Sequence, residues 1–165
     1  MSCQPHPPPP RSAPAAAPVP APVRSGTDAL RVLLLATPPP LAAETLAFFL
    51  DHEGRGGVIT IVSDTTDPAT VLPVAECLCR AAEGVPSATA LVIASVRPGG
   101  SVLAADGERW HDLSRVATEH GVHLLEWFVI GADGVHCPRE MAGEPDRWRV
   151  SARASSPPPP PPAPT

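Results

Sequence analysis

The chain has 165 residues and a formal net charge of −5, with 17 acidic side chains against 12 basic ones, all of them arginine. An acidic chain without a basic stripe is a poor candidate for nucleic-acid binding, because contacts to phosphate supply much of that affinity. No apolar stretch reaches the roughly 20 residues of a membrane-spanning helix, so no membrane contact is expected. The start of the chain does not resemble a signal peptide, since prolines fill residues 7–10.

Many of the 25 prolines gather near the two ends. Residues 1–27 are rich in Pro and Ala, and residues 151–165 contain a run of six prolines. Such segments cannot bury enough apolar surface to offset chain entropy, so both are predicted to be disordered tails. The polyproline run could be a ligand for proline-binding domains, although low-complexity sequence is the simpler interpretation. One domain is expected over residues 28–150, in a cytoplasmic protein whose cysteines remain thiols.

In the first half of the domain, the pattern predicts a β-hairpin followed by a helix. The apolar residues 30–35 form either a strand or the end of a segment that leads into the fold. Residues 41–50 suit a helix by propensity. Residues 45–51 precede the β-rich residues 58–62, however, and this context favours a strand and a hairpin. Pro73 fits the first position of a helix over residues 73–83. The core face of that helix is expected to hold Val74, Leu78 and Ala81 or Ala82.

The second half is predicted to contain a strand, a helix and a final hairpin. Residues 88–94 are apolar, as expected of a central strand that is covered on both faces. Residues 106–120 carry an apolar stripe typical of a helix, and Gly121 would end it. That stripe comprises Trp110, Leu113, Val116 and Ala117. Residues 122–130 form the next strand, and a turn leads to a return strand within residues 131–138.

Three segments carry a resemblance to a known family. Residues 95–100 read Ser-Val-Arg-Pro-Gly-Gly, where a similar strand of the bacterial RadC proteins ends in His-Asn-His-Pro-Ser-Gly. Residues 64–73 resemble the RadC stretch Gly-Thr, five residues, then Val-His-Pro-Arg-Glu. Residues 121–131 resemble Gly-Ile-x-Leu-Leu-Asp-His-Ile-Ile-Ile-Gly, and Arg139-Glu140 follows where RadC proteins often have Arg-Glu. RadC is a branch of the JAB/MPN metal hydrolases, so the resemblance implies an α/β, JAB/MPN-like (cytidine-deaminase-like) mixed sheet flanked by helices.

JAB hydrolases hold zinc with two His and one Asp, and they use a Glu as general base and a Ser at the oxyanion. The resemblance transfers these roles to a set of positions that we call the degenerate set. Ser95 and Arg97 fall at the two histidines, and Ala105 falls near the serine. The aspartate corresponds to Glu108 or, given a short deletion, to Asp106, and the general base corresponds to Glu44, which is one residue out of register. Zinc hydrolysis needs three protein ligands and an open position. A guanidinium instead brings a fixed positive charge. We therefore expect no metal, no other cofactor and no catalytic residue.

Two enzymatic alternatives stay open. An anion-binding enzyme would use Arg97 with the backbone of Gly99 and Gly100 at the strand end, although the loop lacks a specific phosphate-binding pattern. A relocated metal site would have to use the remaining ligand types, which are His111, His120, His123, His136 and Cys137. The preferred hypothesis is a catalytically inactive domain that serves as a protein-binding or scaffold module, through a protein partner or self-association. In that case, the ring of Trp127 could fill the former pocket.

Overall fold

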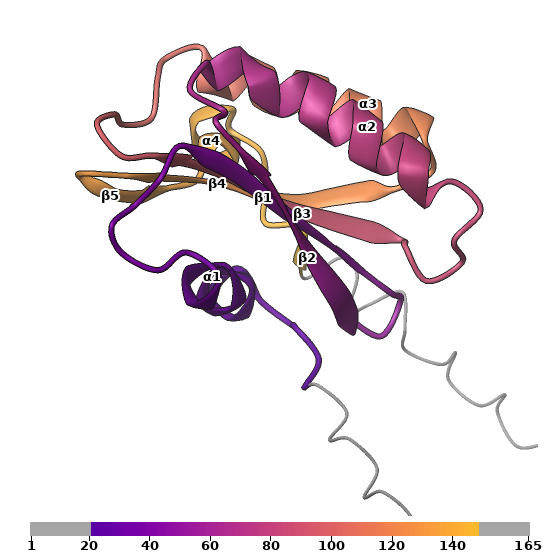
Figure 1. The fold of residues 1–165 in the computed structure, drawn as a ribbon. Helices are drawn as coiled ribbons and strands as arrows, with labels where there is room; N and C mark the ends of the chain where they lie inside the picture. The colour runs from indigo at the N-terminus through magenta and orange to yellow at the C-terminus, as the bar shows by residue number, and fades with distance from the viewer. Residues whose placement is uncertain (1–20, 149–165) are drawn as a thin grey trace, which may run out of the picture.

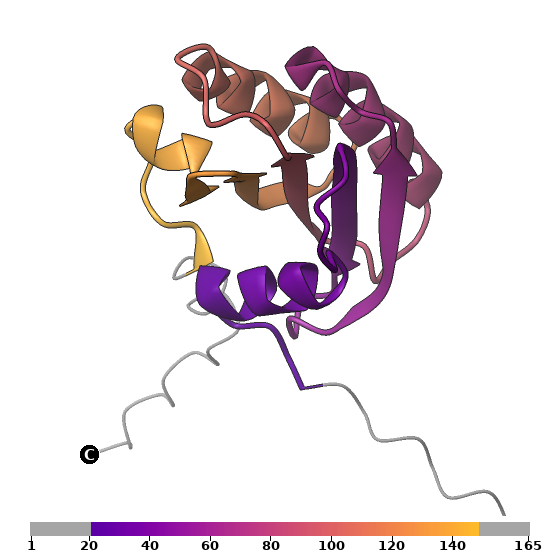
Figure 2. The same cartoon turned by 60° about the vertical axis from the view of Figure 1, so that its left-hand side comes forward.

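A five-stranded mixed sheet forms the middle layer of the structure, a computed structural model that describes residues 21–148. Its strands are β1 (Glu44–Leu50), β2 (Gly56–Ser63), β3 (Ala90–Arg97), β4 (His123–Gly131) and β5 (Gly134–His136). They lie in the order β2-β1-β3-β4-β5, and β3 and β4 are the parallel pair. Helices α2 (Val71–Ala82) and α3 (Asp106–Glu119) cover one face, and α1 (Gly26–Leu35) lies on the other (Figure 1; Figure 2). The predicted α/β class, with helices flanking a mixed sheet, is confirmed.

Residues 30–35, expected to be a strand or a lead-in segment, are instead the second half of α1. The helix begins after Ser25, whose hydroxyl oxygen accepts a hydrogen bond from the Asp28 backbone N–H at 3.1 Å. This side-chain cap satisfies one of the free N–H groups of the first turn. Ala29 and Leu33, one turn apart, are fully buried. Because Val23 is buried as well, the folded part begins before residue 28, the boundary that we predicted. The rest of the two expected tails lies outside the described residues.

The predicted hairpin is confirmed, and β1 is a central strand. It pairs antiparallel with β2 on one side and with β3 on the other. Helix propensity alone would have favoured a helix over residues 41–50. Tertiary context overrides it because Phe48 and Leu50 are buried on one face of the sheet and Ala47 on the other.

An apolar core lies on each side of the sheet. Successive side chains of β3 belong to one core and then to the other. Val92 and Ala94 pack toward α1, whereas Leu91 and Ile93 pack toward α2 and α3. All eight residues of β3 are buried, as expected of a strand covered on both faces. This alternation decides on which side of the sheet each polar residue of the strand ends lies.

Helix α2 starts two residues earlier than predicted. A short 3-10 turn (Pro68–Thr70) precedes it, and the Asp67 carboxylate accepts a hydrogen bond from the Ala69 backbone N–H at 2.9 Å. Pro73 is therefore the third helical residue instead of the first, which is still within the turn that needs no N–H partner. The earlier start also changes the core face. The buried residues of α2 are Val71, Ala75 and Cys79. Of the predicted core residues, Leu78 is partly buried and packs against this core, whereas Val74, Ala81 and Ala82 are not among its members.

The predicted second helix and final hairpin are confirmed with small changes. Helix α3 buries Trp110, Leu113 and Ala117, and Gly121 follows its end with φ +74°. Only glycine adopts this backbone conformation without strain. The return strand β5 has only three residues, and it leads to the short helix α4 (Pro138–Met141). Within residues 21–148, no helix combines the length and the apolar character needed to cross a membrane.

The sheet assignment makes a direct prediction for Ile93, which is fully buried and lies between Ala47 of β1 and Trp127 of β4. Ile93→Ala should lower the free energy of unfolding by about 2–5 kcal/mol, because it removes core methyl groups and leaves a cavity. Urea denaturation followed by far-UV circular dichroism measures the change. Leu35→Ala is the matched control, since that side chain is 86% exposed and its loss should have little effect. Equal stabilities for the two variants would contradict the assignment.

Candidate functional site

The candidate site lies where β3 ends and α3 begins, on the side of the sheet that α2 and α3 cover. Ser95 and Arg97 are the last two β3 residues on this side, because they alternate with Ala94 and Val96, which pack toward α1. Both polar side chains are buried. The strand therefore continues three residues beyond the predicted end at residue 94, and it places both side chains inside the domain.

Arg97 forms a two-pronged ion pair with Asp106, the first residue of α3. Its Nη1 donates to Oδ2 at 2.6 Å, and its Nη2 donates to Oδ1 at 3.1 Å. Nη1 also donates to the Ser101 carbonyl oxygen at 3.1 Å. The Asp106 side chain is fully buried, and the Arg97 side chain is only 9% exposed. Guanidinium and carboxylate groups match each other in this paired geometry, so the contact is strong and directional.

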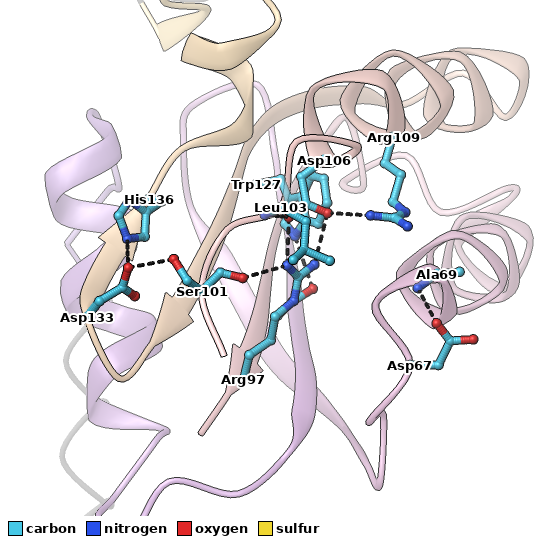
Figure 3. A network of polar contacts seen from close by, with 11 residues as sticks. Asp67, Ala69, Arg97, Ser101, Leu103, Asp106, Arg109, Trp127, Asp133 and His136 are labelled. Atoms are coloured by element: carbon cyan, nitrogen blue, oxygen red, sulfur yellow. Dashed lines mark hydrogen bonds and ion pairs between the residues drawn. The ribbon is translucent and has the colours of Figure 1, made fainter. Parts of the chain in front are cut away.

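Asp106 collects four hydrogen bonds and so has all its acceptor positions occupied. Besides the two from Arg97, it accepts one from the Leu103 backbone N–H at 2.8 Å and one from Arg109 Nη1 at 2.7 Å (Figure 3). Burial alone would raise the pKa of Asp106. Hydrogen bonds from Arg97, Leu103 and Arg109 together outweigh burial, so the pKa lies below its usual value. Asp106 is therefore a stable anion between two guanidinium groups.

Ser95 binds Trp127, the residue paired with Ile93 on β4. The indole Nε1–H of Trp127 donates to Ser95 Oγ at 3.1 Å, and the ring is fully buried in the core beneath α2 and α3. The ring therefore fills space beside the strand end. The neighbour of Ser95 on β1 is Thr45, whose hydroxyl donates to Thr65 Oγ1 at 3.1 Å.

Glu44 does not join the other carried-over positions. It pairs with Val96, which packs toward α1, so it lies on the opposite side of the sheet from Ser95 and Arg97. The residue on the correct side is Thr45, which has no carboxylate. The register of Glu44 differs by one residue from that of the family's general base. This difference excludes Glu44 from the side of the sheet that carries Ser95 and Arg97, since a shift of one residue moves a strand side chain to the other face.

Two further positions also differ from the sequence-based placement. Glu108 is exposed on α3, and the carboxylate that meets Arg97 belongs to Asp106, the alternative that assumed a short deletion. Ala105 precedes α3 and is exposed. Of the degenerate set, the structure thus brings together Ser95, Arg97 and Asp106, and it leaves Glu108 and Ala105 at the surface.

The loop that was a candidate anion site is held by its own backbone. Gly100 donates its N–H to the Arg97 carbonyl at 3.0 Å, and its carbonyl accepts from the Ala132 N–H at 3.2 Å. Gly131 must be glycine, because a Cβ there would stand 2.3 Å from the Gly100 carbonyl oxygen. Gly99 is exposed with open space around it. The loop therefore packs against the end of β4 instead of forming a cradle of free N–H groups.

A surface chain of hydrogen bonds continues from this loop. Ser101 Oγ donates to Asp133 Oδ2 at 2.5 Å, and His136 Nε2 lies 3.1 Å from the same oxygen (Figure 3). The hydrogen bond from Ser101 is the main cause that lowers the pKa of Asp133. This chain joins the β3 loop to the β4–β5 hairpin.

The remaining candidate ligands are dispersed. His111 lies 3.9 Å from Glu144, His120 Nδ1 lies 2.5 Å from Glu83, and His123 is exposed at the start of β4. Burial raises the pKa of the Cys137 thiol to about 12, which leaves it protonated at neutral pH. Among residues 21–148, no group of three or more His, Cys, Asp and Glu side chains has a geometry suited to a metal ion.

A second buried ion pair was not predicted. Arg139 Nε on α4 donates to Glu126 Oε2 on β4 at 2.9 Å, and both side chains are buried. Burial raises the pKa of Glu126 even though Arg139 acts to lower it. The resemblance offered a signal, because Glu126 falls at the Asp of the RadC strand pattern and Arg139 at the Arg of its Arg-Glu pair. The pair fixes α4 against the sheet.

Comparison with known proteins adds no relative. No family model matches the chain, and no curated protein matches it at a significant level.

The Arg97–Asp106 pair predicts strong coupling between its two members. Asp106→Asn should cost about 3–5 kcal/mol of unfolding free energy, because it leaves a buried guanidinium uncompensated. Arg97→Met should also destabilise, and the double variant should lose clearly less than the sum of the two single losses. Urea denaturation of the four proteins measures this coupling. Arg115→Ala, which breaks an exposed pair with Glu119, serves as the control and should change little. Strictly additive losses would show that the buried pair is not formed.

The lowered pKa of Asp106 predicts where its contribution depends on pH. Below the ordinary value of 3.8, the unfolded chain binds a proton that the folded protein still excludes, so stability rises with pH across that window. Above this pH, the contribution of Asp106 to the free energy of unfolding is fully present. The stability difference between the native protein and Asp106→Asn should therefore grow as pH rises toward about 5 and then stay constant. A difference that shrinks over this range would mean that the folded pKa is raised instead.

Proposed function

We propose that this is a RadC-like JAB/MPN domain that has lost its metal site and acts as a protein-binding or scaffold module in the cytoplasm. One observation carries the proposal. The guanidinium of Arg97, at a position where the family has a zinc-binding histidine, is bonded to Asp106, which is the candidate for the family's aspartate ligand. The Arg97 guanidinium thus occupies the carboxylate that a zinc ion would need as a ligand.

Further observations support this assignment without depending on that pair. The element order is one helix, a hairpin, then two helix–strand units and a short return strand, around a mixed sheet. Ser95, at the second histidine position, lies on the same side of the strand as Arg97 and is bonded to Trp127. Thr45 stands at the place on β1 where a general base would have to be. The free thiols Cys77, Cys79 and Cys137 suit a reducing compartment.

The geometry favours the module over an anion-binding enzyme. Both terminal nitrogens of Arg97 already donate to Asp106, and one donates also to Ser101. The third nitrogen, Nε, is buried without a hydrogen-bond partner in the described part of the chain. An anion arriving at the Gly99-Gly100 loop would have to displace a buried carboxylate to reach this guanidinium, which is costly.

Zinc content tests the proposal. The purified native protein should contain no stoichiometric zinc, and chelation should change neither its melting temperature nor any activity. In contrast, Ser95→His with Arg97→His restores two imidazoles on the same side of β3 and removes the guanidinium that occupies both oxygens of Asp106, which keeps its hydrogen bonds from Leu103 and Arg109. This double variant should gain zinc binding, measured by elemental analysis and by titration with a zinc indicator.

Adding Asp106→Asn to the double variant supplies the matched control, because it removes the carboxylate ligand without changing the shape of the side chain. Zinc affinity should then fall again, as expected on loss of one of three ligands. One tightly held zinc per chain in the native protein, lost together with a hydrolytic activity on chelation, would overturn the proposal.

A further inference from the structure

The outer edge of β2 is one of the two edges of the sheet. β2 is the terminal strand on its side, and its residues, Gly56–Ser63, include no charge and no proline. Native proteins protect edge strands with short length, charges, prolines, β-bulges or a covering segment. The opposite edge follows this rule, since β5 has three residues. The pairing of β2 with β1 is irregular between Gly56 and Ile59, and it is regular over Ile59–Ser63. Across residues 21–148, no strand pairs with the outer edge of β2.

The side chains of β2 are apolar and partly exposed on both faces. Val58 is 78% exposed and Ile61 is 45% exposed. Ile59 and Ile61 lie on the α1 side, because they pair with Phe48 and Leu46 of the core beneath α1. Thr60 and Val62 lie on the other side, because they pair with Ala47, of the core beneath α2 and α3, and with Thr45. Val58 lies in the irregular part of the pairing, between Gly56 and Ile59. An added strand would cover apolar surface on both faces of the sheet.

The sequence of β2 is symmetric about Thr60. Residues 58–62 read Val-Ile-Thr-Ile-Val, the same in both directions. We propose that two copies of the chain pair antiparallel through β2, about a two-fold axis at Thr60, and join their two sheets into one. In this register, Val58 faces Val62 of the second copy, Ile59 faces Ile61, and the two Thr60 residues face each other. Such an interface is self-complementary, as two-fold symmetry requires.

The chemistry of these pairs favours the arrangement. Directly opposite β-branched residues and Thr–Thr pairs stabilise antiparallel strands. No like charges meet across the strand, because the nearest charged residues are Arg55 before it and Asp64 after it. Antiparallel pairing brings each Arg55 to the end that carries Asp64 of the second copy. Arg55 also holds Asp51 and Glu53, and about half of its side chain (48%) remains exposed.

This inference goes beyond the proposed function, since it concerns a different surface and would hold whether or not the domain binds metal. A zinc-bound native protein would overturn the proposed function and leave the β2 interface untouched. A native protein that is monomeric would overturn the proposed interface, and it would leave the interpretation of the Arg97 site unchanged.

Sedimentation and light scattering of the full chain, over a dilution series, test the association. The native protein should show a species of twice the 17.1 kDa chain mass that dissociates on dilution. Val58→Lys with Ile61→Lys places charges against Val62 and Ile59 of the second copy and should yield a folded monomer, with the far-UV circular dichroism spectrum of the native protein. Leu35→Lys, at an exposed apolar residue of α1, is the matched control and should leave the dimer intact. A native protein that is monomeric at every concentration overturns the proposal, as does a dimer unaffected by the lysines.

Cysteine cross-linking tests the register. Two residues on the axis have Cα atoms about 4.5–5.5 Å apart, within the range that a disulfide spans. Thr60→Cys should therefore give a covalent dimer on mild oxidation. Val58→Cys should not, because its counterpart lies four residues away along the strand, roughly 13 Å. The native protein, with its exposed Cys77, sets the background. Cross-linking of Val58→Cys equal to or above that of Thr60→Cys would contradict pairing about Thr60.

Discussion

The buried ion pair between Arg97 and Asp106 is the interaction on which the site depends. It joins the end of β3 to the start of α3, and the Leu103 N–H and the Ser101 carbonyl complete its hydrogen bonds. A lone charge at either position would be strongly destabilising, so each residue constrains the other. Chemistry that needs a vacant carboxylate at this place must first break the pair.

Strand alternation then decides which other residues belong to the site. Ser95 and Arg97 lie on the side that α2 and α3 cover, with Trp127 filling the space between strand and helices. Thr45 reaches this side, and Glu44 does not. We propose that Arg97 and Ser95 replace the two zinc-binding imidazoles of a metal hydrolase, and that Thr45 stands in place of its carboxylate base. Their hydrogen bonds are internal to the domain, which is what a structural core requires.

Much of the fold could be predicted from local patterns, and most of the errors concern register. The apolar stripe and Gly121 were sufficient to predict α3, and the apolar run over residues 88–94 was sufficient to predict β3. The α1 helix was missed although Ser25 and Asp28 offered a cap signal. The choice between Glu108 and Asp106 needs the length of a deletion, which one sequence does not contain. The pairing of Glu126 with Arg139 joins two elements and has no local signature.

The central proposal is that Arg97 replaces a zinc-binding histidine and holds Asp106, the carboxylate that would have been a metal ligand. Anomalous X-ray diffraction at the zinc absorption edge, from crystals soaked in zinc at neutral pH, tests it most directly. The account predicts an intact Arg97–Asp106 contact and no anomalous peak within coordination distance of the Asp106 carboxylate. A zinc peak on that carboxylate, with the Arg97 side chain displaced from it, would contradict the account.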